Sequence, residues 1–361
     1  MKVREITVGE LPAFIRSDEY AGLQPKPISP LRAISQAKNP DARDEDVALV
    51  FAAEKNTLLA FAGILPHRAK GVDAPVFSNS GWWVHPQLGR KFGLPVFLKA
   101  FQFCERRMFL TDSTAHTKSI LERTGLFTMD PEVKGSRFFL RFYLGNLLRR
   151  KGKNRVLSGF FSAADSIFNI AVDLRFSFFF KKSHLKAYSL NAVERLDEQH
   201  LLFIEKHPGN SFLRQNTEKL NWVVQYPWVA CNAPEDEIEY PFTYHVAHFR
   251  QEFLEVKRDN ELVALLLLSV RDKHASIPFI YCTEGVLADV AHLLWKHLFQ
   301  MKANSLVVFN TELEKAFRNS GRKWLLRKEI IRFAGYSNEL KPIFSEKEYA
   351  FQDGDGDVAF T

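Results

Sequence analysis

Polar and apolar residues alternate in short blocks along the first part of the chain, and each block predicts one secondary-structure element. Two apolar runs flank the polar residues 54–57, which is the pattern of a β-hairpin over 46–66. Ahead of it, Ser29 suits the N-cap of a short helix whose first residue is Pro30. After it, the aromatic and β-branched residues of 77–84 predict a strand.

The pattern then switches between helical and extended periods. We expect, in order, a glycine-containing loop over 85–93, a helix over 94–106, a strand over 107–111, a helix over 114–124 and a strand over 136–143. The first part of the chain therefore reads as helix, hairpin, strand, loop, helix, strand, helix and strand.

Residues 145–182 separate this part from the rest. A basic patch is followed by a mostly apolar stretch over 156–180, which is long enough to be considered as a transmembrane helix. Against this, Asp165, Asp173 and Arg175 lie inside the stretch, and each such charge costs about 2.5–3.5 kcal/mol near the centre of a bilayer. We therefore expect a buried connector helix and no stable membrane insertion, with a helix lying on a membrane surface as the alternative.

The second half repeats the element order of the first, but not its residues. It has a hairpin pattern around 258–261, then a strand over 277–282, a helix over 286–301 and a strand over 305–310. A length of 361 residues also fits two domains. We divide the chain into a first domain over 1–144, a helical connector over 145–182 and a second domain over 183–361.

Charge and cysteine content narrow the class of protein. The net charge of +7 suits a nucleic acid, an anionic membrane or a phosphorylated ligand as partner. Because the chain has no zinc-finger spacing and no aromatic-basic RNA-binding signature, we expect no DNA partner. Three cysteines, far apart and odd in number, indicate neither a disulfide framework nor a zinc site. With a start that carries no apolar run, this predicts a cytoplasmic protein.

The segment that could carry chemistry is the passage from the strand at 77–84 into the helix at 94–106. The strand runs into a loop that contains Gly89 and Gly93, and the helix begins there. Free N–H groups and the dipole at a helix start attract anions, and glycines let the backbone approach phosphates closely. We therefore interpret this loop as a pyrophosphate site.

This stretch resembles the CoA-binding motif of the GNAT superfamily of acyl-CoA N-acyltransferases. In that family a strand ending in Val-X-Pro leads into a loop of pattern Arg/Gln-X-X-Gly-X-Gly/Ala and then into a helix. Here Arg90 takes the first position of the loop, Gly93 the middle one, and Pro95 the position of the last Gly or Ala. The run 118–127 is also similar to the late helix of the family, so the resemblance covers about residues 1–143.

The resemblance implies a fold, a cosubstrate and a set of binding residues. The implied fold is α+β, with two GNAT-like domains that each have a mixed, mostly antiparallel sheet flanked by helices. The implied cosubstrate is acetyl-CoA or another acyl-CoA, with no metal ion. The residues implied to bind it are Trp83 and Val84 on the strand and Arg90, Lys91, Phe92, Gly93 and Leu94 in the loop.

The acid–base groups depart from the family. Leu121 stands where the family commonly has a tyrosine that protonates the leaving thiolate. In the second half, Glu284 lies in the equivalent loop and would repel phosphate, so we expect CoA in the first domain only and a degenerate second domain. His67 and His85 lie at the ends of strands and are our candidates for the general base, because imidazole accepts a proton near neutral pH. The alternative for each is a hydrogen-bonded structural histidine.

Two further clusters are interpreted as structural. Residues 353–357 carry three alternating carboxylates, like the start of a calcium loop, but without the distal glutamate that such a loop needs. We expect an acidic turn leading into a last strand over 358–360. The aromatic cluster 222–228 is expected to pack in a core, with the wall of an acceptor site as the alternative.

Together with the resemblance, these features predict an N-acyltransferase that moves an acyl group, expected to be acetyl, from acyl-CoA to a small-molecule amine such as an amino sugar. Two alternatives stay open. One is a non-catalytic binding protein that has the GNAT fold. The other is a tRNA-dependent aminoacyl transferase of the tandem-GNAT type, which would need a long basic groove; we do not expect tRNA as a partner.

Overall fold

The computed structural model describes residues 2–130, 132–145, 148, 155–181, 185–231, 239–321, 324–346 and 349–360. Its contacts divide the chain into two compact units, and neither unit is continuous in sequence. Unit 1 comprises Met1–Val133, Arg195–Phe249 and Arg332–Thr361, and unit 2 comprises Lys134–Glu194 and Arg250–Ile331. The continuous segments expected from the sequence, 1–144, 145–182 and 183–361, do not coincide with these units.

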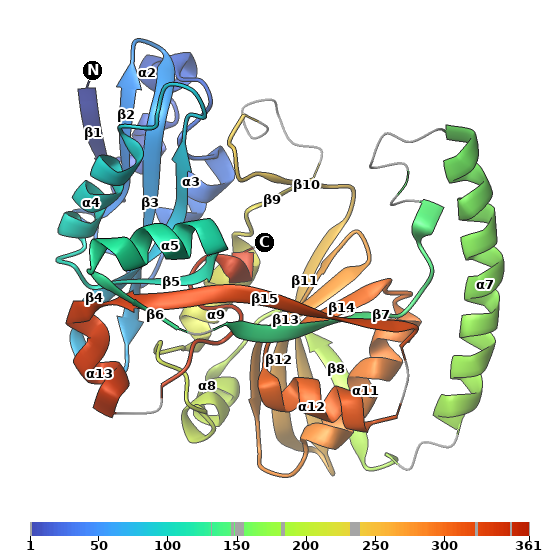
Figure 1. Cartoon of the computed structure of the whole chain (residues 1–361). Helices are drawn as coiled ribbons and strands as arrows, with labels where there is room; N and C mark the ends of the chain where they lie inside the picture. Colours follow the sequence, from blue (N-terminus) through green and yellow to red (C-terminus); the bar gives the residue numbers. More distant parts are fainter. Residues whose placement is uncertain are drawn as a thin grey trace. The chain divides into compact units, whose positions relative to one another are not determined.

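Unit 1 is built on a sheet in the order β1-β2-β3-β4-β5-β15 (Figure 1). Its strands are β1 (Lys2–Thr7), β2 (Val47–Glu54), β3 (Thr57–Ala69), β4 (Val72–Val84), β5 (Met108–Ser113) and the second part of β15 (Leu326–Ser337), with short β6 (Phe127–Met129) beside β15. Neighbours in β1 to β4 are antiparallel, β4 and β5 are parallel, and β5 and β15 are antiparallel. The expected hairpin and the strand that follows it are confirmed as parts of β2, β3 and β4.

Helices pack on both faces of this sheet. They are α1 (Leu11–Phe14), α2 (Asp18–Gly22), α3 (Pro30–Gln36), α4 (Gly93–Phe103), α5 (Ala115–Thr124) and α9 (Thr217–Gln225), while α8 (Glu198–Lys206) packs against α9. Figure 1 shows α4 and α5 together on one face, where Phe97 and Phe101 of α4 are buried in the same cluster as Phe77 of β4. A second cluster holds Leu11 and Phe14 of α1, so both faces of the sheet are covered.

The helix ends follow the capping residues in the sequence. The Ser29 hydroxyl accepts a hydrogen bond from the N–H of Arg32, and α3 begins at Pro30. The Thr114 hydroxyl caps α5 in the same way, and Gly125 ends that helix in the left-handed region at φ +67°. Both predicted helices are therefore confirmed, α3 with its expected start and α5 with its expected end.

The strands of unit 2 follow the order β7-β14-β13-β12-β11-β8. Its strands are β7 (Val133–Phe139), β8 (Tyr188–Val193), β11 (Phe249–Arg258), β12 (Glu261–Arg271), β13 (His274–Cys282) and β14 (Ser305–Val308). Its helices are α7 (Arg155–Lys181), α11 (Leu287–Gln300) and α12 (Thr311–Asn319). The core centres on Trp295 of α11, which is fully buried and packs edge-on against Phe138 of β7. The hairpin, strand, helix and strand expected in the second half are all present.

Exchanged last strands explain why the units are discontinuous. The strand expected over 136–143 forms as β7, but it pairs with β14 in unit 2, with Phe139 opposite Ser305. The matching place beside β5 of unit 1 is taken by β15, with Phe333 opposite Ser113. An apolar pattern predicts that a segment forms a strand but not which strand it pairs with, so the sequence could not predict the partners of β7 and β15.

Two expectations about single elements are wrong. The connector helix expected to be buried is α7, and among its described side chains only Val172 and Phe176 are buried. The last strand expected over 358–360 is a 3₁₀ helix, η2 (Val358–Phe360), because Phe360 stacks on the Trp228 ring at 4.3 Å and packing overrides the strand propensity. None of the helices in the described ranges is long and apolar enough to cross a membrane.

Candidate functional site

The two parallel strands at the centre of unit 1 separate soon after they meet. β4 and β5 pair at Phe77 with Met108 and at Ser78 with Phe109, and no further pair joins them. From Asn79 onward, the edge of β4 that faces β5 therefore has no partner in that strand. Trp83 and Val84, two of the predicted binding residues, lie in this open stretch, where backbone N–H and C=O groups can pair with a ligand.

A β-bulge lies at the start of the open stretch. Ala62 pairs with Trp82 and Ile64 pairs with Asn79, so Gly63 alone stands opposite Ser80 and Gly81. Gly81 has φ +95°, a conformation that favours glycine. The Asn79 side chain donates to the carbonyl oxygens of Gly63 at 3.1 Å and Gly81 at 3.3 Å, which holds the bulge in place.

The glycines of the following loop are required by packing against strands. A β-carbon on Gly89 would stand 2.1 Å from the carbonyl oxygen of Leu59, and one on Gly93 would stand 2.5 Å from Cγ2 of Val84. The Gly89 N–H donates to the carbonyl of His85 at 3.0 Å. The sequence interpretation had these glycines facing a phosphate. In the structure, the absence of a side chain at both positions lets the loop and the start of α4 pack close to β3 and β4.

The N-terminal end of α4 is flanked by positive charge, and the N–H groups of Phe92 and Gly93 there donate to the carbonyl of Gly89. Its N-cap residue, Phe92, forms no side-chain cap, and its first turn contains no acidic residue. Pro95 has no N–H to donate, and it is accommodated in that first turn. Arg90 and Lys91 are exposed immediately before the helix, so their positive charge adds to that of the helix dipole. Leu94, the last of the predicted loop residues, follows at the second helical position.

The C-terminal segment of the chain crosses the point where β4 and β5 separate. A β-carbon on Gly356 would stand 2.8 Å from the Thr111 hydroxyl and 3.6 Å from Cβ of Ser78, so the segment lies directly against both strands. The Thr111 hydroxyl also donates to the carbonyl of Asp355 at 2.9 Å. The sequence interpretation placed no functional residue here, because chain distance gives no sign that residues near 356 return to β4.

Solved structures with the same arrangement identify the fold. No protein-family model matches the sequence, and no curated protein matches it. A probable N-acyltransferase from Enterococcus faecalis, a conserved protein of unknown function, superposes with a TM-score of 0.53 at 9% identity, covering 94% of this chain and 73% of that one. The chain has the GNAT fold.

Two structures described as GNAT proteins match most of the chain at lower TM-scores. A tandem GNAT protein from the clavulanic acid biosynthesis pathway has a TM-score of 0.47 at 10% identity and covers 93% of this chain and 97% of that one. A glucosamine N-acetyltransferase region of a fungal multidomain β-N-acetylglucosaminidase has a TM-score of 0.47 at 12% identity. That match covers 93% of this chain, which spans 38% of the fungal protein.

His67 is enclosed in the GNAT fold of unit 1. Its Nδ1 lies 3.1 Å from the Nζ of Lys219, which only donates, and its Nε2 lies 2.9 Å from the Ser78 hydroxyl. Lys219 also pairs with Asp41 at 2.7 Å. Burial, together with the charge of Lys219, lowers the pKa of His67 well below its usual value, so the ring is neutral. This histidine connects β3, β4 and α9 and is 1% exposed.

His85 holds the shape of the loop between β4 and α4. Its Nδ1 accepts hydrogen bonds from the N–H groups of Gln87 and Leu88, both at 3.2 Å. A neutral ring that accepts at Nδ1 carries its proton on Nε2 and has no second lone pair to offer. Neither His67 nor His85 therefore presents an unoccupied basic nitrogen in this conformation, and the histidine base stays a prediction without geometric support.

Asp357 is a carboxylate beside the bulge that the sequence interpretation missed. Its Oδ2 lies 3.4 Å from both the Arg32 guanidinium and the Ser80 hydroxyl, and 23% of its side chain is exposed. Burial raises its pKa, and the charge of Arg32 opposes that rise. Arg32 is held by the faces of Trp228 at 4.3 Å and Tyr240 at 4.9 Å.

The acidic run around Asp357 is otherwise occupied by protein partners. Asp353 pairs with Arg332, and Asp355 accepts from Gln215 at 3.1 Å and from the Gln352 N–H at 2.8 Å. Within the described ranges, no group of His, Cys, Asp and Glu side chains is placed to hold a metal ion.

Leu121 stands where the GNAT family commonly has a tyrosine, but a different tyrosine, Tyr240, lies beside the bulge. Leu121 is fully buried in the core between α4, α5 and the sheet. A β-carbon on Gly81 would stand 3.0 Å from the Tyr240 hydroxyl, so this hydroxyl adjoins the bulge. Burial raises the pKa of Tyr240 to about 12, and its proton is retained at neutral pH.

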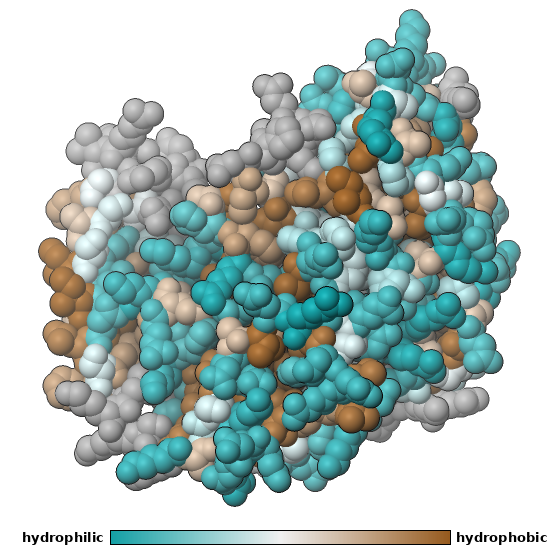
Figure 2. Space-filling model, turned by 180° about the vertical axis from the view of Figure 1, so that it is seen from behind, coloured by the Kyte–Doolittle hydropathy of each residue, from teal (hydrophilic) through white to brown (hydrophobic). Residues whose placement is uncertain are grey.

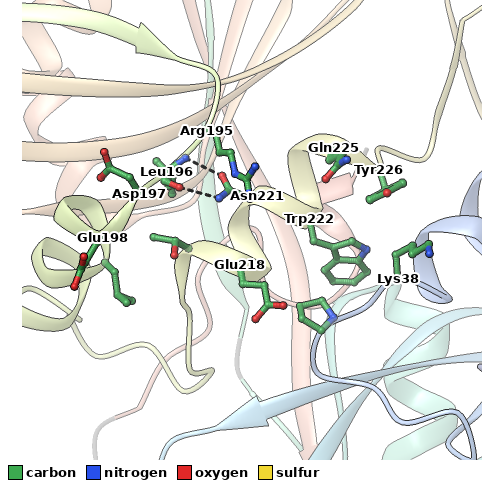
Figure 3. A pocket seen from close by; sticks show the side chains of 13 residues that line it. Lys38, Arg195, Leu196, Asp197, Glu198, Glu218, Asn221, Trp222, Gln225 and Tyr226 are labelled. Atoms are coloured by element: carbon green, nitrogen blue, oxygen red, sulfur yellow. Dashed lines mark hydrogen bonds between the residues drawn. The ribbon is translucent and has the colours of Figure 1, made fainter.

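A hollow of about 600 Å³ in unit 1 is separate from this site. In Figure 3, Asn221 of α9 faces Leu196 and forms two hydrogen bonds with its backbone, at 2.8 and 2.9 Å. Trp222 borders the hollow but is buried; its indole donates to the Ser35 carbonyl and contacts Phe360. This tryptophan packs in the core, as expected from the sequence.

Unit 2 also has two parallel strands that separate and a helix that follows them, but the start of that helix is acidic. β13 and β14 pair over three residues and then separate, and β12 and β13 shift register between Leu267 and Ser269. The helix that follows, α11, has Asp289 in its first turn, where it accepts from the Tyr188 hydroxyl at 2.8 Å. With Glu284 in the preceding loop, this helix start is acidic, so it is unsuited to a phosphate.

Proposed function

We propose that this chain is an N-acyltransferase that moves an acyl group from acyl-CoA to an amine. One observation carries the proposal: the open, bulged stretch of β4 leads directly into an uncapped helix start flanked by Arg90 and Lys91. An acyl-CoA has the matching parts, because its thioester and amide-rich arm need strand backbone and its phosphates need donors and positive charge.

In this proposal the cosubstrate lies along β4. The backbone near Trp83 and Val84 pairs with the pantetheine amides, and the loop from Arg90 to Leu94 holds the pyrophosphate. The bulge at Gly81 directs backbone polar groups away from β3 and towards the thioester carbonyl.

The reaction needs one proton to leave the amine and one to reach the sulfur. The amine nitrogen attacks the thioester carbon, the carbon–sulfur bond breaks, and CoA leaves as a thiol. The amine attacks in its neutral form and loses one proton as the amide forms. We assign removal of that proton to Asp357, because a carboxylate with a raised pKa lies beside the bulge and can accept it. We assign donation to the thiolate to Tyr240, whose hydroxyl adjoins Gly81.

The finer assignment is an acetyl group and a small polar amine such as an amino sugar. The groups beside the bulge are Asp357, Arg32 and Ser80, a set that suits a hydrophilic cation better than an apolar acceptor. The same side chains would accommodate other small amines, so the acceptor is to be identified by assaying a panel of amines.

The test is a matrix of acyl-CoAs and amines. Thermal unfolding with each acyl-CoA identifies the donor, since a ligand at a hundred times its dissociation constant adds about 2.7 kcal/mol of stability. Thiol release is then measured with each amine, using wild type and Asp357→Asn. An acyl-CoA that stabilises the protein, with turnover lost in the variant, supports the proposal. Binding without turnover for every amine would favour the non-catalytic alternative.

A further inference from the structure

Helix α7 of unit 2 presents an apolar face to solvent. Its exposed large side chains are Phe160 (70%), Ile167 (68%), Phe168 (54%), Ile170 (62%), Leu174 (59%) and Phe178 (72%). Figure 2 shows brown, hydrophobic side chains along the left edge of the molecule, the side on which α7 lies. An exposed apolar set of this kind marks a contact surface.

Three polar side chains of α7 bond to the rest of unit 2, whereas Arg175 is exposed. Asp165 accepts from the N–H of Gly145 at 2.8 Å, and Asn169 bonds both the N–H and the C=O of Phe142, at 3.0 and 2.9 Å. Asp173 pairs with Arg141. These bonds fix the rotation of the helix about its axis, so its outward apolar face is set by specific inward contacts.

The outward face is continuous and wide. Positions 160, 164, 167, 171, 174 and 178 follow one another at spacings of four and three residues, and all carry apolar side chains. Phe168 and Ile170 widen this stripe on either side. The arrangement is that of a helix lying in an interface, with one broad apolar side and one polar side.

The positive charge of the chain is concentrated at this helix. Residues 145–186 contain nine Lys or Arg residues and two Asp residues, a net charge of +7, which equals that of the whole chain. The basic residues cluster before the helix, over 149–155, and after it, over 181–186. Both aspartates bond to groups of unit 2, and 45% of the Asp173 side chain remains exposed.

We propose that α7 is a docking surface for an anionic lipid bilayer, on which the helix lies parallel to the membrane plane. The apolar face enters the boundary between headgroups and acyl chains, and the basic clusters at both helix ends contact anionic headgroups. Apolar burial and electrostatic attraction together give peripheral membrane binding, and each alone gives little.

A second copy of the chain is a poorer occupant of the same face. Two paired helices need a narrow apolar seam flanked by complementary charges, whereas Phe168 and Ile170 occupy the flanking positions here. Because both ends of α7 are basic, two copies would bring like charges together in either orientation. An anionic surface satisfies both ends at once.

The experiment uses the full-length protein and vesicles of phosphatidylcholine, with and without about one third phosphatidylglycerol. We expect wild type to float with the anionic vesicles and not with the neutral ones, and added salt to weaken binding. Ile167→Asp combined with Leu174→Asp should weaken binding to anionic vesicles by about tenfold or more. Both side chains are exposed, so the unfolding temperature of the variant should stay close to that of wild type.

The matched control is Leu202→Asp combined with Leu326→Asp, which changes two equally exposed leucines outside α7 and should leave vesicle binding unchanged. If the α7 variant is misfolded, Ile167→Ser with Leu174→Ser replaces it. The proposal is overturned if wild type does not bind anionic vesicles, or if both double variants bind as wild type does. It is also overturned if sedimentation shows a wild-type dimer that the α7 substitutions make monomeric while no vesicle binding is found.

Discussion

Gly63 lies so close to Ser80 that a β-carbon on Gly63 would stand 2.3 Å from the Ser80 carbonyl oxygen. This approach exists because Gly63 of β3 faces the bulge of β4, where two residues oppose one. The bulge, and with it the open stretch of β4, therefore depends on a residue without a side chain on the neighbouring strand.

Gly63→Ala should lower the free energy of unfolding by about 1–3 kcal/mol, since the methyl group must displace backbone atoms of β4. Acyl-CoA binding should fall with it, because the bulge moves. Chemical denaturation and calorimetry check the two effects. Gly159→Ala is the control: nothing lies within 4 Å of that position in α7, so the same change should be neutral or slightly stabilising.

Removing the two cations before α4 should weaken acyl-CoA binding without affecting the fold. Arg90→Ala with Lys91→Ala should raise the dissociation constant by about five- to tenfold at low salt, and by less at high salt, because both side chains are exposed. Titration calorimetry at two salt concentrations measures this. Lys55→Asn with Lys302→Asn removes the same charge from two left-handed turn positions that asparagine tolerates. An equal loss in that control would mean that net charge alone is responsible.

Replacing the proposed base should change turnover and its pH dependence together. Asp357→Asn should lower kcat by about 10²–10⁴-fold while acyl-CoA affinity stays the same, because the carboxylate lies away from the phosphate loop. In wild type, the rate should fall as pH drops through the raised pKa of this carboxyl, and the variant should lack that acid limb. Asp73→Asn, which changes an exposed carboxylate at the start of β4, serves as control. A variant with the wild-type profile would exclude Asp357 as the base.

His85→Asn separates a structural histidine from a catalytic one. An asparagine oxygen can accept from the N–H groups of Gln87 and Leu88 as Nδ1 does, so the loop should keep its shape. We expect kcat within about threefold of wild type and no change in the pH profile, since Nδ1 is already engaged. A loss of two orders of magnitude would restore His85 as the general base.

Asp355 should make stability fall as pH rises. Burial raises its pKa from 3.8 to about 6, so the folded state holds its proton more tightly than the unfolded state. Its contribution is full below pH 3.8 and is lost as pH rises through about 6, a change of about 3 kcal/mol. Measured against Asp355→Asn, wild type should lose that amount between acidic and neutral pH. An unchanged difference between the two proteins would place the carboxyl in a more polar setting.

The sequence by itself determined the local elements of unit 1 and the loop that joins β4 to α4. The hairpin around 54–57, the capped starts of α3 and α5, and the passage from β4 into α4 depend on turn residues, caps and apolar spacing within short windows. The GNAT fold could be predicted for the same reason, because its motif lies in one continuous stretch. The acidic start of α11 could also be predicted from the sequence, because Glu284 lies in the loop that precedes this helix.

The tertiary structure decided how distant segments meet. The partners of β7 and β15, the return of Asp357 to Ser80, and the placing of Tyr240 beside Gly81 join residues that lie far apart in the chain. The direction of the two faces of α7 was decided in the same way, by the inward bonds of Asp165 and Asn169. A local pattern specifies a strand or an amphipathic helix, but the neighbour that covers it is chosen by packing and by the pairing of buried polar groups.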